Sequence, residues 1–583
     1  MTAGRRSRRG GVGLRTNGGG GSARPERALN ELEKLLSAYG GAAGAAKRRL
    51  LAELAGLRFG RARQLVALQR IVCFLSAFPD DAAVHRTARR LGAGFAARVA
   101  RLARAERERL DDTGAAGSVT RHSYAASAAR WMQQRYAGAA AIDWKAASVA
   151  DALAALIAPR LAPMEAEAVD LSRAGVRRWL AQARGRHGGG DLAWLLSQAG
   201  AGSAGQAFER DFDAAEVPLA WRLDDRSGIT GNFLRGPVVP REAGMRRASG
   251  DARTAIAQPM PIERLPRRAA ARLLDVWRAA LWSRTRSVLQ IEQPDLDQCW
   301  LAELGGGLRF AAIGVAPARR DLLEATYGHL LLANGVPIGY GGFTALFAQV
   351  NTGINVFPEF RGSEAAFAFE QALRAMHTIT GNLRFVVNPY QFGAGNDEAL
   401  QSGAYWFYYR LGFRSADPAV RALAEAETAR LRAGRGYRVP IATLRRLAAC
   451  DIHLDLTDDA GEKFFDEAWL EHLGAGITPA LASEGVANRA AALAQLARRI
   501  AGLLGVRLER WRATERSGLA RFAPILAQID DLADWPAADR DALAQIVRAR
   551  GSAQERDFIA GMRGHDRLRR SLARAAQRAA AQP

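Results

Sequence analysis

The chain has 583 residues, of which 49% are hydrophobic and 24% charged, and its formal net charge at pH 7 is +23. This length is too great for one hydrophobic core and predicts several folding units, while the composition excludes collagen-like and coiled-coil proteins. Three cysteines, Cys73, Cys299 and Cys450, lie far apart, so they form neither a disulfide framework nor a CxxC metal site, and we expect no metal.

The first half of the chain reads as a tail, a helical domain and a linker. Residues 1–25 contain "GRRSRRGG" and "NGGGGSARP" and predict a disordered basic tail. No apolar segment follows these arginines, so no secretory signal is expected and the protein is predicted to be cytoplasmic. Residues 26–184 place apolar residues three and four apart, which predicts an all-helical domain. Residues 185–265 are rich in glycine and proline and predict a loop-rich linker.

Residues 266–416 change from a helical to a strand pattern. A helix is expected first, and five short β-type runs follow: "LRFAAIGVA", "YGHLLLA", "VPIGYGGFTALF", "NTGINVF" and "LRFVVNPY". Asn334-Gly335 separates the second run from the third and predicts a β-hairpin, because both residues tolerate positive φ. The uncharged span from Leu330 to Pro358 is long enough to cross a bilayer, but its turn residues favour a buried sheet.

The stretch "INVFPEFRGSEAAFAFEQAL", residues 354–373, predicts a strand that turns directly into a helix. Such a helix start leaves several backbone N–H groups unpaired and pointing the same way, which suits an anion such as phosphate. The residues alone leave two interpretations open. The turn either holds a phosphate or only ends the strand.

A second helix is predicted in "GNDEALQSGAYWFYYRLGFR", with Asn396 as its N-cap and Gly412 at its end. Leu400, Ala404 and Phe407 would share its apolar face. Residues 417–583 predict a C-terminal helical region, with a short strand at "GYRVP" or "DIHLDL". The whole chain is therefore expected to be α+β, with a mixed, mostly antiparallel central sheet between two all-helical flanks.

The central block, roughly residues 290–416, resembles the GNAT superfamily of acyl-CoA-dependent N-acyltransferases. Two motifs carry the resemblance: "VFPEFRGSEAAF" is similar to the family's strand–turn–helix that grips coenzyme A, and "AYWFYYRLGF" is similar to its later A-x-x-F-Y-x-x-x-G-F helix. In that family the fourth strand splays from the fifth and opens a V-shaped slot for the pantetheine arm. The resemblance implies an acetyl-CoA or other acyl-CoA cofactor.

The resemblance also implies a set of cofactor-binding residues. The backbone of Asn355 and Val356 would pair with the pantetheine arm. The turn and helix start would hold the pyrophosphate through backbone N–H groups and one guanidinium, and its residues are Arg361, Gly362, Ser363, Glu364, Ala365 and Ala366. Glu364 departs from the family pattern, which has glycine there, and its carboxylate would repel a pyrophosphate unless it points elsewhere.

The family reaction is the attack of an amine on a thioester, which needs a base for the amine and an acid for the departing thiolate. The resemblance places Tyr408 as the acid. Glu359 is the expected base, and Asn388 and Tyr390 would line the acceptor side. Each residue also has a structural interpretation: an aromatic core for Tyr408, a solvated turn residue for Glu359, an ion pair for Arg361 and a turn for Asn388.

The predicted function is therefore transfer of an acyl group, acetyl first of all, from coenzyme A to an amine on an unknown acceptor, such as a protein or another large amine. Two alternatives stay open. The first is a non-catalytic binding or scaffold protein of the same fold. The second is nucleic-acid binding through the arginine-rich flanks, because residues 297–416 hold eight Arg against nine Asp and Glu, and the positive charge lies outside them. No membrane partner is expected.

Overall fold

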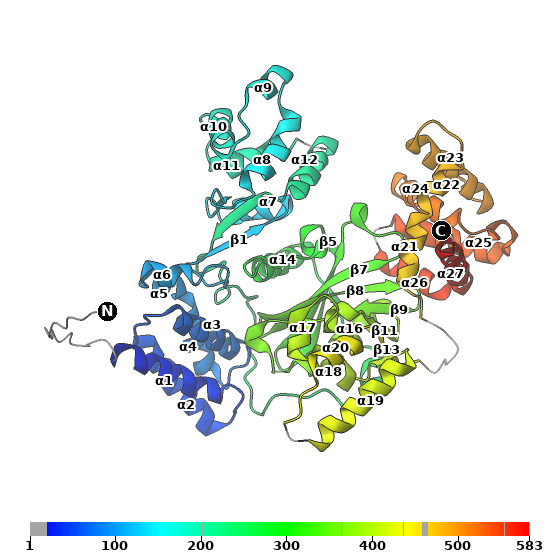
Figure 1. The fold of residues 1–583 in the computed structure, drawn as a ribbon. Coiled ribbons are helices and arrows are strands. Elements are labelled where there is room, and N and C mark those ends of the chain that lie inside the picture. Colours follow the sequence, from blue (N-terminus) through cyan, green and yellow to red (C-terminus); the bar gives the residue numbers. More distant parts are fainter. Residues whose placement is uncertain are drawn as a thin grey trace, which may run out of the picture.

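The computed structural model describes residues 20–200, 202–362, 364–434, 436–457, 464–552 and 554–581. The chain is α+β, as predicted, and a large central sheet has helices on both sides (Figure 1). In this view the first helices of the chain gather at one end of the sheet, and the last ones gather at the other.

Helices fill most of the first 215 residues. They are α1 (Gly20–Leu35), α2 (Gly41–Gly56), α3 (Ala62–Ala77), α4 (Ala82–Ala93), α5 (Phe95–Ala100), α6 (Arg104–Glu108), α7 (Ala126–Arg135), α8 (Val149–Ile157), the 3-10 turn η1 (Ala158–Arg160), α9 (Pro163–Ala168), α10 (Arg173–Arg184), α11 (Gly190–Ser197) and α12 (Gly202–Ala215). Helix α1 begins inside the segment predicted as a tail. Residues 1–19 of that prediction lie outside the described part of the chain.

A three-stranded antiparallel sheet corrects two predictions. Its strands β1 (Val119–Ser123), β3 (Pro218–Arg222) and β2 (Ala140–Ile142) lie in that order. The segment 26–184 is therefore not all-helical, and 185–265 is more than a linker, since it holds α11, α12 and β3. These strands have three to five residues, too few for an alternating pattern to stand out from helix-rich surroundings.

Within the described residues the central sheet contains ten strands. They are β4 (Glu263–Arg264), β5 (Pro294–Gly305), β6 (Leu308–Val315), β7 (Ala325–Ala333), β8 (Val336–Leu346), β9 (Gln349–Thr352), β10 (Asn355–Val356), β11 (Arg384–Val387), β12 (Arg414–Ser415) and β13 (Ile452–Asp455). Nine follow the order β12-β13-β11-β9-β8-β7-β6-β5-β4, and β10 pairs with β8. The predicted hairpin between β7 and β8 is confirmed: Asn334 and Gly335 have φ values of 46° and 78°.

Different helices cover the two faces of this sheet. Helices α14 (Arg267–Trp282) and α15 (Leu289–Glu292) lie over the face of Gly328, where a Cβ atom would meet the side chains of Gln290 and Trp277. Helix α16 (Ala365–Thr380) lies over the other face, where Thr352 of β9 contacts Met376. The uncharged span 330–358 is thus buried sheet, as predicted. Among the described residues no helix is long and apolar enough to cross a bilayer.

The second predicted helix is broken in two. Gly403 has a φ of 66° and separates α17 (Asp397–Ser402) from α18 (Ala404–Arg410), whereas we expected one continuous apolar face. Asn396 caps α17 as predicted, accepting a hydrogen bond from the amide of Ala399 at 3.1 Å. A left-handed glycine ends the first helix and lets the second start in a new direction.

The region after residue 416 is mostly helical but contributes one strand to the centre. Strand β13, from "DIHLDL", lies between β11 and β12, so the short strand predicted there is confirmed. The other candidate, "GYRVP", forms no strand in its described residues. The remaining elements are η2 (Pro317–Arg319), η3 (Pro358–Phe360), α13 (Ala252–Ala257), η4 (Pro389–Phe392), α19 (Pro418–Ala433), α20 (Ile441–Leu447), α21 (Ala468–Ala475), α22 (Ile477–Ala482), α23 (Arg489–Leu503), η5 (Leu508–Arg510), α24 (Ala513–Leu526), η6 (Leu532–Asp534), α25 (Ala537–Arg550), α26 (Glu555–Gly564) and α27 (Asp566–Ala580).

Candidate active site

The fourth predicted strand run divides into two strands with different partners. Strand β9 runs parallel to β11, with Asn351 opposite Val386 as the last pair. Beyond it, β10 pairs with β8 alone. The backbone pairing to β11 therefore ends where β10 begins, and we call this break in the sheet the splay.

The backbone of β10 has one side turned toward the splay. The amide of Phe357 donates to the carbonyl of Ile338 on β8 at 3.0 Å. Because amides alternate in direction along an antiparallel strand, the N–H and C=O of Val356 point away from β8. Asn355 is exposed and Val356 half-buried. Only the backbone of Val356 faces the splay, because the same alternation turns the backbone groups of Asn355 toward β8, which corrects the predicted cofactor role of the Asn355 backbone.

The strand continues through η3 into the turn and then α16. Arg361 and Gly362 are exposed, and Gly362 adopts a φ of 78° with open space where a Cβ would stand. The first intrahelical bond runs from the amide of Ala368 to the carbonyl of Glu364 at 2.8 Å. The amides of Ala365 and Ala366 precede that bond, and no side chain caps the helix. Ser363, also predicted to bind the cofactor, lies outside the described residues.

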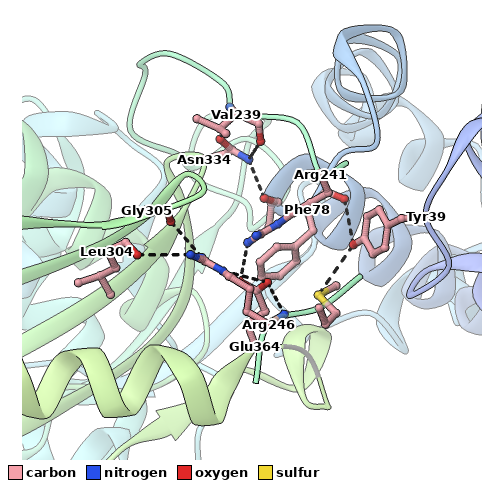
Figure 2. Close-up of polar contacts among 11 residues, drawn as sticks. Tyr39, Phe78, Val239, Arg241, Arg246, Leu304, Gly305, Asn334 and Glu364 are labelled. Carbon is pink, nitrogen blue, oxygen red and sulfur yellow. Dashed lines mark hydrogen bonds and ion pairs between the residues drawn. The ribbon is translucent and has the colours of Figure 1, made fainter. Parts of the chain in front are cut away.

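Glu364 faces neither a phosphate nor solvent. Its side chain is 0% exposed and forms ion pairs with Arg241 at 2.5 Å and Arg246 at 3.2 Å, while the amide of Arg246 donates to it at 2.8 Å. Figure 2 shows these contacts. Arg246 also donates to the carbonyl of Gly305 at 3.0 Å. The carboxylate thus links the segment 241–246 to the start of α16. Because it is buried against these arginines, it does not face a pyrophosphate on the turn, and the predicted repulsion is wrong.

Arg361 is linked to the second helix of the motif. Its guanidinium pairs with Glu398 in the first turn of α17, and Arg286 lies 3.7 Å from the same carboxylate. All three side chains are about half exposed. Two guanidinium groups therefore stand beside the turn, and an incoming phosphate would compete with Glu398 for them.

Tyr408 points its hydroxyl into the splay. Its oxygen accepts a hydrogen bond from the amide of Ile354, in the break between β9 and β10, at 3.3 Å. The ring is 1% exposed and packs edge-on against Phe369 of α16 at 5.7 Å. Burial raises the pKa of Tyr408, which keeps its hydroxyl protonated at neutral pH. The aromatic core predicted for this residue is confirmed, and its role as the acid stays a prediction.

Glu359 does not face the splay. Its side chain is 8% exposed and pairs with Arg284 at 3.3 Å, whose guanidinium lies 4.0 Å from the ring of Phe357. Burial, followed by the nearby carboxylate of Glu359, raises the pKa of Cys73 on α3 to about 12. Glu359 therefore lies in a buried ion pair beside the N-terminal helices, which corrects both its predicted role as the base and its interpretation as a solvated residue.

Asn388 and Tyr390 lie at the end of β11, on the mouth of the splay. Asn388 is exposed and its carbonyl accepts from the amide of Gln391 at 3.1 Å, which starts η4. Tyr390 is 58% exposed. The side chain of Gln391 reaches Gly353, where a Cβ would come within 2.4 Å of it. Both predicted residues border the opening, and Gln391, which we did not predict, packs against its backbone.

A carboxylate on the face opposite α16 was also missed. Asn351, Val386 and His453 lie opposite one another on β9, β11 and β13, and the side-chain amide of Asn351 donates to Glu467. Burial, and then Asp451, raise the pKa of Glu467. Glu467 follows Asn351 by more than one hundred residues, so only the folded sheet brings this carboxylate to the splay.

Comparison with protein-family models, curated proteins and solved structures gave no match.

Proposed function

We propose that the chain is an acyl-CoA-dependent N-acyltransferase of the GNAT type, with its active site in the splay. The observation that carries the proposal is the parting of β10 from β11, with the hydroxyl of Tyr408 at the amide of Ile354 in the break. The motif resemblance and the uncapped start of α16 support the same assignment.

The residues fit the cofactor in three places. The Val356 backbone can pair with the amides of a pantetheine arm as a neighbouring strand would. The N–H groups of Ala365 and Ala366 suit phosphate oxygens, and Arg361 and Arg286 add positive charge beside them. Acetyl-CoA would supply the activated acyl group.

The proton transfers are assigned to side chains on opposite faces of the sheet. Acetyl-CoA would supply the thioester carbon that the amine attacks, and Tyr408 would hold the proton that the leaving sulfur takes up. Glu467, held by Asn351, takes the proton that the amine loses. A carboxylate with a raised pKa is a better base than an ordinary one, and Glu467 replaces Glu359 in this role.

Isothermal titration of the full chain with acetyl-CoA tests the proposal. Val356→Pro removes an N–H that faces the splay and leaves pairing with β8 intact. One lost hydrogen bond is worth about 1 kcal/mol, so binding should weaken roughly fivefold. Asn355→Ala, on the same strand, is the matched control and should bind normally.

Other outcomes decide between the alternatives. If saturating acetyl-CoA gives no heat, the fold is a binding or scaffold module without this reaction. If acetyl-CoA binds but Val356→Pro has wild-type affinity, the pantetheine arm lies elsewhere. Turnover that survives Glu467→Gln would remove the assigned base while leaving the cofactor site in place.

A further inference from the structure

A cavity of about 650 Å³ lies near the end of the central sheet that is formed by β5 and β4, away from the splay. Three separate stretches wall it: the end of α7 at residues 135–136, the segment 226–235 after β3, and residues 265–276 at the start of α14. Leu301 of β5 also lines it. Ligand pockets in proteins have volumes of roughly 300–1,000 Å³, so this cavity is large enough for a nucleotide-sized molecule.

The walls carry a clear excess of positive charge. Four arginines line the cavity, Arg135, Arg226, Arg235 and Arg272, against one acid, Asp275. Asp275 is already engaged, because it accepts a hydrogen bond from the indole of Trp131 at 2.7 Å and lies 3.7 Å from Arg135. A cationic ligand would be repelled from these walls, whereas an anion would be attracted.

Two of the four arginines have guanidinium groups available for a ligand. Arg235 and Arg272 are exposed, and within the described part of the chain neither side chain makes a hydrogen bond or an ion pair. A third arginine stands behind them, since Arg89 stacks on the ring of Phe233 at 3.3 Å. Burial, with a contribution from Arg235, lowers the pKa of Arg89 to about 10. Guanidinium groups crowded in this way favour phosphate, which they bind through paired N–H groups.

The remaining walls are flat or apolar. Two aromatic residues, Tyr136 and Phe233, line the cavity, and Arg226 lies 5.6 Å from the Tyr136 ring. Leu273, Val276 and Leu301 supply aliphatic surface beside them. Nucleobases stack on aromatic rings and guanidinium planes with about 1–3 kcal/mol per base. A ligand that satisfies both kinds of wall has a phosphate at one end and a flat ring at the other.

We propose that this cavity binds a small nucleotide, with its phosphates on Arg235 and Arg272 and its base against Tyr136 and Phe233. The site is distinct from the splay. Strand β5 lies four positions from β9 in the sheet order, which at about 4.8 Å per strand separates them by roughly 19 Å. The inference therefore does not depend on the proposed acyltransferase activity.

Titration of the full chain with ADP, followed by calorimetry and tryptophan fluorescence, tests the proposal. Trp131 contacts both Tyr136, at 5.4 Å between ring centres, and Asp275, so ADP should change the emission. The double variant Arg235→Gln/Arg272→Gln should bind ADP at least tenfold more weakly, and it should fold because both side chains are exposed. Ala269→Trp, which fills the cavity from α14, should abolish binding.

The controls separate a built site from general attraction to a basic protein. Arg432→Gln, an exposed arginine on α19 far along the chain, should leave ADP affinity unchanged. Two results would overturn the proposal. One is an equal loss of ADP affinity in Arg432→Gln, and the other is no binding by the wild-type chain at 1 mM ADP, a concentration that would detect a binding free energy of about 4.1 kcal/mol. Pyrophosphate that binds as well as ADP would overturn the role of the aromatic walls.

Two further ligands test the class of the molecule. An oligonucleotide that binds far more tightly than ADP, with steep loss in salt, would overturn a small-molecule site and favour nucleic acid. Acetyl-CoA binding should be the same in the wild type and in the double variant. If it falls in parallel with ADP binding, the cavity is no separate site and the proposal fails, whatever the outcome for the splay.

Discussion

Replacing Glu364 with glutamine should destabilise the protein by about 3 kcal/mol or more. The carboxylate is 0% exposed, and its main partner, the Arg241 guanidinium, is 7% exposed. Burial lowers the pKa of Arg241 even beside this carboxylate, as expected for a guanidinium that is largely removed from water. Removing one member of a buried pair typically costs about 3–5 kcal/mol because the other charge stays buried. Glutamine can still accept a hydrogen bond from the amide of Arg246, so we expect a loss of stability at the lower end of this range.

The effect is measured by urea denaturation and by hydrogen exchange at the Arg246 amide, which donates to Glu364 at 2.8 Å. Glu398→Gln is the matched control. Its carboxylate also meets two arginines but is 55% exposed, and exposed pairs are worth about 0–1 kcal/mol. If Glu364→Gln costs no more than Glu398→Gln, with unchanged exchange at Arg246, the buried pair does not fasten the segment 241–246 to α16.

Three other changes have defined outcomes. Tyr408→Phe should lower acyl transfer by at least tenfold with little change in acetyl-CoA affinity, and unchanged turnover would refute its role as the acid. Asn334→Ala removes three hydrogen bonds of 2.8–3.0 Å and places alanine at a φ of 46°, so urea denaturation should show a loss of about 3 kcal/mol, and Asn334→Gly should recover about 1 kcal/mol of it. Burial, then Asp321, raise the pKa of Glu324 to about 7, so the folded chain holds a proton that the unfolded chain releases. The contribution of Glu324 to stability should be fully present below pH 4.5 and be lost as the pH rises through about 7. The difference in unfolding free energy between the wild type and Glu324→Gln, measured across that range, should therefore change in favour of the variant as the pH rises.

Interactions between residues close in the sequence were sufficient to predict part of this fold. The Asn334-Gly335 pair specified its hairpin because two neighbouring residues both adopt positive φ, and Asn396 specified the start of α17 through its own side chain. The turn into α16 was similarly visible from Pro358 and Gly362. Each of these features depends on residues a few positions apart, which is the range over which a sequence pattern carries information.

The features that were missed depend on residues distant in the chain. Arg241 and Glu364 are 123 positions apart, so nothing near Glu364 indicated that its carboxylate would be buried. Glu359 was predicted to be the base because it follows the strand directly. Its ion pair with Arg284, which comes from another segment, holds it beside the N-terminal helices instead. The cavity at β5 combines three segments, each of which alone is an ordinary arginine-containing loop or helix.

The position of β13 affects the order in which the central sheet can form during translation and where the chain can be truncated. Strand β12 pairs only with β13 in the described sheet, and β13 is synthesised some 35 residues after it. During translation β11 therefore has one unpaired edge until residue 455 has left the ribosome. A fragment ending at residue 416 would carry that bare edge permanently, and exposed strand edges promote aggregation, so a fragment meant to contain the whole central sheet should extend beyond residue 455.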